Sequence, residues 1–210
     1  VIASNGPTII GSLAMVLLAA YICYFVHAVV VYSLTVSTLG GMSPVKFFKG
    51  MMPAIMFAFS SASSVGTLPI NLSCTEKLGA KREIASFVLP LGMTINMNGT
   101  AIMQVVATLF IAGCAGYDVT LSQIIVVALL ALIASAGTPA APGAGAIILF
   151  TILSGLGYIN DGALLAYSLI LAINRPIEML VTALNVVGDS ATAIYVAKSE
   201  GMLNEDIYNS

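Results

Sequence analysis

The chain has 210 residues, of which 59% are hydrophobic and only 8% are charged. A soluble domain carries about 25% charged residues, so we expect this chain to be an integral membrane protein. The net charge of −2 does not indicate a protein that binds nucleic acid. The three cysteines lack the spacing of metal ligands. The apolar runs are long and do not alternate, which favours helices over a β-barrel.

The first apolar run covers residues 9–39 and ends at Gly40-Gly41. At about 1.5 Å per residue it exceeds a bilayer core of about 30 Å. The sequence therefore predicts one long or tilted transmembrane helix within residues 1–42. Pro44 suits the first turn of the helix that follows.

Residues 43–80 contain no full span. Short apolar stretches at 47–59 and 68–78 flank a polar, serine-rich run at 60–67. Two half-length helices with a polar tip predict a re-entrant hairpin, with the second helix beginning at Pro69. A serine nucleophile would need a base, and the only histidine, His27, lies in the first helix, so the tip does not indicate a hydrolase.

The most informative segment lies within residues 81–116. There Asn96-Met97-Asn98-Gly99-Thr100 interrupts an apolar stretch, 84–115, that is long enough to cross a bilayer. Water cannot satisfy polar groups at that depth, so we expect the helix to unwind or to face a cavity. Residues 185–189 place a similar polar cluster, with Asn, Gly and Asp, in a later apolar stretch. Two polar breaks of one kind predict a transport site built from discontinuous helices.

The hairpin pattern recurs over residues 117–160, with apolar stretches at 121–133 and 146–156 around a tip of small residues at 134–145. A last long helix is expected at 163–197, within 161–202, and residues 203–210 form a tail. Two copies of hairpin plus helix are typical of inverted-repeat transporters. In this layout the basic loop residues share one side, which the positive-inside rule makes cytoplasmic. The first hairpin then opens to the cytoplasm and the second to the outside.

The last helix carries a polar stripe of Glu178, Thr182, Asn185 and Asp189, spaced by four, three and four. In lipid this face should turn toward the protein interior or an aqueous cavity. The stripe is either a hydrogen-bonded network between helices or a binding face for a cation and a polar solute, and the two polar tips favour binding. Arg175 could pair with Glu178 or snorkel to an interface.

Four motifs, in order along nearly the whole chain, resemble the glutamate/neutral amino acid transporter family (dicarboxylate/amino acid:cation symporters). They lie at residues 63–69, 89–100, 137–146 and 185–189. The resemblance implies a homotrimer in which a mobile transport domain moves against a scaffold, an elevator-type alternating-access mechanism. This chain would correspond to the sixth helix, hairpin one, the seventh helix, hairpin two as the gate, and the eighth helix. The N-terminal scaffold half would be missing, because the chain is a fragment or because a partner supplies it.

The resemblance also implies the site residues. Asn185 would hold the α-carboxylate of the amino acid and Glu178 its amine. The whole substrate set would be Ser64, Thr100, Ala141, Gly145, Glu178, Val181, Thr182 and Asn185. One Na⁺ would bind to Gly92, Asn96, Asn185 and Asp189, where unwound carbonyls supply oxygen ligands. A second Na⁺ would bind to Thr94, Met97, Ser135, Ala136 and Thr138.

Three positions depart from the family pattern. Acidic-substrate members have an arginine where this chain has Val181, so a side-chain carboxylate would lie unpaired and we expect a neutral substrate. Glu178 replaces the usual aspartate. Asn98 also replaces an aspartate, which removes the charge from a third cation site.

We therefore expect a multi-pass, Na⁺-coupled symporter for a neutral amino acid in a plasma or bacterial inner membrane, and no enzymatic activity. Three alternatives stay open. One is H⁺ coupling through Glu178, another is an acidic amino acid or dicarboxylate as substrate, and the third is a channel-like or non-transporting membrane subunit.

Overall fold

The computed structural model describes residues 2–209, with side chains described for residues 10–208. Over these residues the chain is helical apart from turns and one isolated bridge between Ala80 and Leu203, which confirms the predicted all-α class. Three helical stretches are long and apolar enough to cross a membrane. They are Ile10–Leu39, Arg82–Cys114 and Asn174–Ser199.

The first long helix changes its winding along its length. It begins as α1 (Ile2–Val26) and continues through π-helical segments at His27–Tyr32 and Thr35–Leu39. In the second π segment, the Thr35 and Thr38 hydroxyls donate to carbonyls four residues back, at 2.9 and 2.6 Å. Such side-chain bonds compete with the regular helix ladder. The expected long span is therefore present, with a wider-wound second half.

The first hairpin consists of α2 (Pro44–Ser61) and α3 (Ser64–Lys77), and Pro44 occupies the first turn of α2 as predicted. The prediction that α3 begins at Pro69 is wrong, because α3 begins at Ser64 and Pro69 lies inside it. The turn residue Ala62 has a φ of 50°, and the Ser63 hydroxyl accepts a hydrogen bond from the Gly66 amide at 3.1 Å. This serine cap stabilises the helix start five residues before the proline.

The interrupted helix is broken where the sequence predicts. It forms α4 (Arg82–Ile95) and α5 (Asn98–Cys114), with non-helical backbone at Asn96 and Met97. The second hairpin follows as α6 (Leu121–Ala136) and α7 (Ala144–Leu156). Its helices extend two or three residues further toward the tip than expected, so the tip shortens to residues 137–143.

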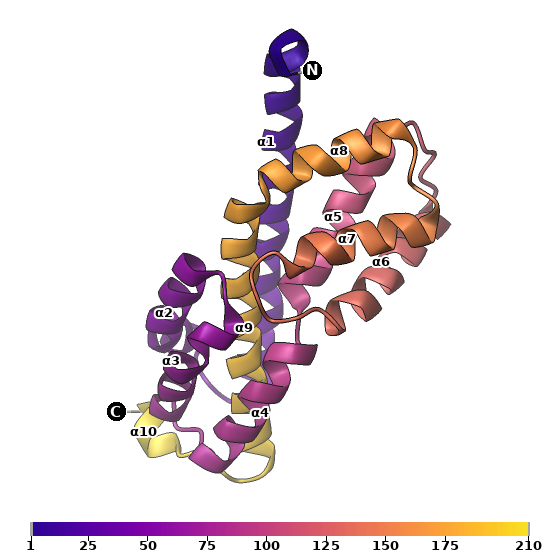
Figure 1. Cartoon of the computed structure of the whole chain (residues 1–210). Coiled ribbons are helices and arrows are strands. Elements are labelled where there is room, and N and C mark those ends of the chain that lie inside the picture. Colours follow the sequence, from indigo (N-terminus) through magenta and orange to yellow (C-terminus); the bar gives the residue numbers. More distant parts are fainter. Residues whose placement is uncertain (1, 210) are drawn as a thin grey trace.

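The last helix is not continuous. It consists of α8 (Asp161–Ala172) and α9 (Asn174–Ser199), and α8 lies across the end of α9 (Figure 1). Pro176 has no N–H to donate to the Ala172 carbonyl, which ends α8 there. The expected break at residues 185–189 is wrong, because α9 runs through them unbroken. Both halves of the chain thus have a hairpin followed by an interrupted helix.

α9 is the central element of the molecule. It packs against α2, α4 and α5, and Figure 1 shows the α2–α3 hairpin and the α6–α7 hairpin on different sides of it. Fifteen of its residues are buried, including the polar Thr182, Asn185 and Asp189. The short α10 (Glu205–Asn209) lies beyond its C-terminal end. The polar stripe of α9 therefore faces the protein interior rather than lipid.

Candidate substrate and cation site

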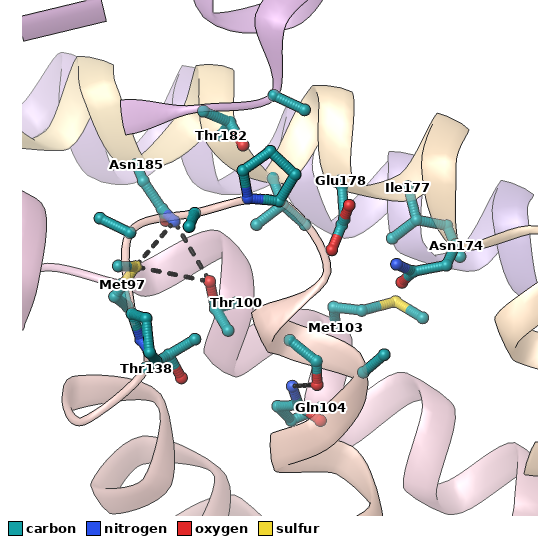
Figure 2. Close-up of a pocket in the computed structure, with 18 of the residues that line it drawn as sticks. Met97, Thr100, Met103, Gln104, Thr138, Asn174, Ile177, Glu178, Thr182 and Asn185 are labelled. Carbon is teal, nitrogen blue, oxygen red and sulfur yellow. Dashed lines mark hydrogen bonds between the residues drawn. The ribbon is translucent and has the colours of Figure 1, made fainter. Parts of the chain in front are cut away.

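Both hairpin tips and the break between α4 and α5 border one cavity on the polar stripe of α9 (Figure 2). Ala62 and Ser64 come from the first tip, and the second tip contributes residues 138–142. All eight residues of the expected substrate set line this cavity. They are Ser64, Thr100, Ala141, Gly145, Glu178, Val181, Thr182 and Asn185.

Asn185 joins α9 to the N-terminus of α5. Its side-chain oxygen accepts a hydrogen bond from the Gly99 amide at 2.7 Å, and its NH₂ group donates to the Thr100 hydroxyl at 3.2 Å and to the Met97 sulfur at 3.3 Å (Figure 2). The first amides of a helix lack partners within it, so Asn185 satisfies one of them from a neighbouring helix. A substrate carboxylate at Asn185 would take the place of Thr100 or Met97 as acceptor.

Glu178 is held by the second hairpin. Its Oε1 accepts a hydrogen bond from the Gly143 amide at 2.7 Å, which links α9 to the start of α7. Arg175 instead donates to the Ser61 carbonyl at 3.4 Å, and no ion pair joins it to Glu178 in the described part of the chain. Both hairpin tips are thus tied to the same end of α9.

Two of the residues expected to bind the first cation, Gly92 and Asn96, lie beside Asp189, whereas Asn185 lies one turn earlier in the unbroken α9. The Asp189 carboxylate is 2% exposed and accepts a hydrogen bond from the Asn96 NH₂ group at 2.9 Å. Gly92 lies so close that a Cβ there would come within 2.7 Å of the Asp189 oxygen. A monovalent cation beside the Gly92 and Asn96 carbonyls would balance the charge of this buried carboxylate.

Tyr32 also belongs to the cluster around Asp189, although the sequence did not predict it there. Its hydroxyl accepts a hydrogen bond from the Asn98 NH₂ group at 3.2 Å. A Cβ on Gly188 would lie 2.5 Å from the Tyr32 oxygen and 2.7 Å from the Asn96 nitrogen. Nothing in the sequence relates Tyr32 to Asn98, because their approach depends on how the long first helix packs against α5.

The residues expected to bind the second cation are brought together only in part. Met97 and Thr138 line the same cavity, and both are buried. The Ser135 hydroxyl is buried without a hydrogen-bond partner among the described residues, as an unfilled oxygen ligand would be. Thr94 and Ala136 are exposed, and the Thr94 hydroxyl donates to the Leu91 carbonyl in its own helix at 2.7 Å.

Gln104, Met103 and Asn174 are among the lining residues of the cavity that were not expected there. Gln104 is 2% exposed, and its NH₂ group donates to the Gly145 carbonyl at 2.8 Å, so it ties α5 to the second hairpin (Figure 2). Its spacing of four from Thr100 places it on the same helix face and could have identified it.

The cavity has a single ionisable side chain. Among its described lining residues this is Glu178, and none of them is Lys, Arg or His. Over residues 2–209 no group of three or more His, Cys, Asp or Glu is placed to hold a metal ion. Any cation here would therefore be bound mainly by amide, hydroxyl and carbonyl oxygens, which suits a hard ion such as Na⁺.

Comparison with known proteins shows which family the chain belongs to. The model of the sodium:dicarboxylate symporter family matches residues 1–199. The chain is 36% identical over 182 residues to the putative sodium-dependent excitatory amino acid transporter glt-4 of Caenorhabditis elegans, which covers 86% of this chain and 36% of the relative. It is 35% identical over 192 residues to human excitatory amino acid transporter 2, which covers 90% of this chain and 33% of the relative.

Rat excitatory amino acid transporter 1 is 35% identical over 184 residues, 87% of this chain and 33% of the relative. The chain thus spans about a third of the length of these relatives, which are named as transporters and not as enzymes. These matches confirm the resemblance seen in the four motifs. The chain belongs to the sodium:dicarboxylate symporter family.

Proposed function

We propose that this chain forms the substrate- and cation-binding part of a secondary active symporter that moves a neutral amino acid together with Na⁺. The observation that carries the proposal is the cavity between the hairpin tips. It combines one carboxylate with amide and hydroxyl groups and has no cationic side chain among its described lining residues.

The charges of the cavity favour a zwitterionic substrate. The substrate's amine would pair with Glu178, and its α-carboxylate would bind to the Asn185 NH₂ group near the N-terminus of α5, where the helix dipole favours an anion. A second carboxylate would meet Val181, which is 8% exposed and has no charge to offer. An unpaired buried charge is costly, so a dicarboxylate would bind poorly despite the family's name.

Coupling to Na⁺ follows from the shared use of Asn185. The expected first cation site includes Asn185 and Asp189, and the expected substrate site also includes Asn185. Filling the cation site would fix the position of Asn185, the residue that the substrate also needs. The cation and the substrate then raise each other's affinity, because coupling between two sites is reciprocal.

The second hairpin is the proposed gate. In the structure Glu178 accepts from Gly143, and Gln104 donates to Gly145. A substrate amine at Glu178 would either replace the Gly143 amide as a donor to the carboxylate or donate alongside it. We propose that a bound amino acid and Na⁺ together favour the closed hairpin, and that the closed unit moves as one body against a scaffold.

The rest of the protein is part of the proposal. The chain spans about a third of the length of the matched relatives. The scaffold half, the homotrimer, an elevator-type movement and a location in a plasma or bacterial inner membrane are proposed for the whole protein. We propose two Na⁺ sites. A third site would lack a carboxylate ligand at Asn98, whose NH₂ group instead donates a hydrogen bond to the Tyr32 hydroxyl.

Uptake into proteoliposomes by the full-length protein tests the proposal. We expect saturable uptake of neutral amino acids driven by an inward Na⁺ gradient, and little uptake of glutamate, aspartate or C4-dicarboxylates. Val181→Arg should shift the preference toward acidic substrates by about tenfold or more, whereas Val181→Leu should not. Acidic uptake by the unmodified protein would support the dicarboxylate alternative, and uptake driven by a proton gradient without Na⁺ would support H⁺ coupling.

A further inference from the structure

A second pocket lies at the opposite end of the first hairpin from its tip. It has a volume of about 260 Å³ and lies where the start of α2 and the end of α3 meet α10. That is slightly smaller than the roughly 300–1,000 Å³ of pockets for drug-sized ligands, so it suits a compact group. Its lining residues are Lys46, Lys49, Gly50, Lys77, Leu78, Ile207 and Tyr208.

The three lysines of this pocket, Lys46, Lys49 and Lys77, have no carboxylate partner in the described part of the chain. The ion pairs there join Arg82 to Glu76 and Lys198 to Glu205, and no acidic residue lines the pocket. Three ammonium groups around one hollow repel one another unless an anion lies between them. The pocket is therefore complementary to a compact anionic group.

Tyr208 fixes the position of Lys46. The Lys46 Nζ lies 5.2 Å from the centre of the Tyr208 ring and donates to the Tyr208 carbonyl at 3.4 Å. The Ser43 amide donates to the Tyr208 hydroxyl, so α10 is fastened across the start of α2. Lys46 is exposed, and these two contacts to Tyr208 keep its ammonium group beside the pocket.

An exposed apolar stripe begins at the same place. Val45, Met52 and Met56 share one face of α2 with Lys49 at helical spacings, and they are 77%, 49% and 60% exposed. In a membrane protein such a face contacts lipid chains. Lys49 lies within the stripe near the charged end of the helix, where a basic residue meets the headgroup region.

We propose that this pocket binds the phosphate of an anionic phospholipid, with an acyl chain lying along the Val45–Met52–Met56 stripe of α2. Basic residues at the cytoplasmic end of membrane helices attract anionic headgroups in this way. The start of α4 and the end of α9 lie at the same end of the molecule as α10 (Figure 1) and carry Lys81, Arg82 and Lys198, so this is the cytoplasmic end by the distribution of charge. A lipid satisfies both the lysines and the apolar stripe, whereas a free phosphate would satisfy the lysines alone.

Binding of lipid to the full-length protein in detergent tests this inference. We would measure thermal stabilisation and the number of retained lipids by native mass spectrometry, with phosphatidylglycerol, phosphatidylcholine and inorganic phosphate as three separate additions. We expect phosphatidylglycerol alone to bind and stabilise. Lys49→Gln and Lys77→Gln should each weaken its binding about fivefold.

Lys81→Gln is the matched control, because Lys81 is an exposed lysine at the same end that does not line the pocket. It should leave lipid binding unchanged, and Lys49→Arg and Lys77→Arg should retain it. Na⁺-dependent binding of the transported substrate, measured on the same samples, reports that each variant is folded. Equal binding of phosphatidylcholine, equal stabilisation by inorganic phosphate, or an equal loss in Lys81→Gln would overturn the inference.

Discussion

At the scale of single residues, glycine determines how closely the helices approach Asp189. Gly92 and Gly188 are the two positions where a Cβ would lie 2.7 Å or less from a polar atom of the cluster. Neither glycine needs an unusual backbone conformation, since both lie inside helices. Their role is to leave room for the Asp189, Asn96 and Tyr32 side chains to meet. The carboxylate is therefore held by packing as much as by hydrogen bonds.

Gly92→Ala should displace the Asp189 carboxylate and weaken Na⁺ binding by about 10–100-fold, the usual effect of disturbing the surroundings of an ion's ligands. The measurement is the Na⁺ concentration needed for half-maximal substrate binding. Gly113→Ala is the control, because a Cβ at Gly113, in α5, meets nothing within 4 Å. An unchanged Na⁺ requirement in Gly92→Ala would exclude Asp189 and Gly92 from the cation site.

At the scale of elements, two of the differences from the expected helix boundaries have a local cause. The sequence predicts that α3 begins at Pro69, but the Ser63 cap and the left-handed Ala62 begin it earlier. At Pro176 the missing N–H ends α8 at Ala172, four residues before it. Conversely, polar residues at 185–189 leave α9 intact, because Asn185 and Asp189 bond to the α4–α5 region through their side chains.

A buried network fastens the first hairpin to α9. The Ser190 hydroxyl donates to the Asn71 side-chain oxygen at 2.7 Å and lies 2.8 Å from the Thr75 hydroxyl. Ser190→Ala should lower the free energy of unfolding by about 1–2 kcal/mol, because the two partners on α3 lose a hydrogen bond in a buried site. Thermal unfolding of the full-length protein measures this. Ser73→Ala, an exposed serine on α3, should change it little, and equal effects would show that the network contributes nothing.

The tip of the second hairpin depends on Gly143, whose φ is 86°. Gly143→Ala should destabilise the closed tip by about 1–2 kcal/mol, because an L-residue is strained in this conformation. Amide hydrogen exchange of residues 143–145 should then quicken by about tenfold. Gly155→Ala, later in α7 and with open space around it, should leave the exchange rate of the tip unchanged. The same rate in both variants would mean that the tip does not rely on the left-handed turn.

At the scale of the whole molecule, the order of elements follows from composition and polar interruptions alone. The hairpin tips, the break at Asn96 and Met97, and the polar face of α9 are each visible in the sequence, because polar groups in an apolar chain must be satisfied within the protein. Their meeting at one cavity followed from the family resemblance. The Glu178–Gly143 and Asn98–Tyr32 contacts could not be predicted, because they depend on distances between elements far apart in the chain.

The central claim is that this cavity binds a neutral amino acid only together with Na⁺ at Asp189. Isothermal titration of the full-length protein with a panel of neutral and acidic amino acids, in Na⁺ and in choline, tests it most directly. We predict saturable binding of a neutral amino acid that requires Na⁺ and is weakened about 100-fold or more in Asp189→Asn, which keeps the shape and removes the charge. Binding that is independent of Na⁺, or unchanged in Asp189→Asn, or tighter for glutamate or aspartate, would contradict the account.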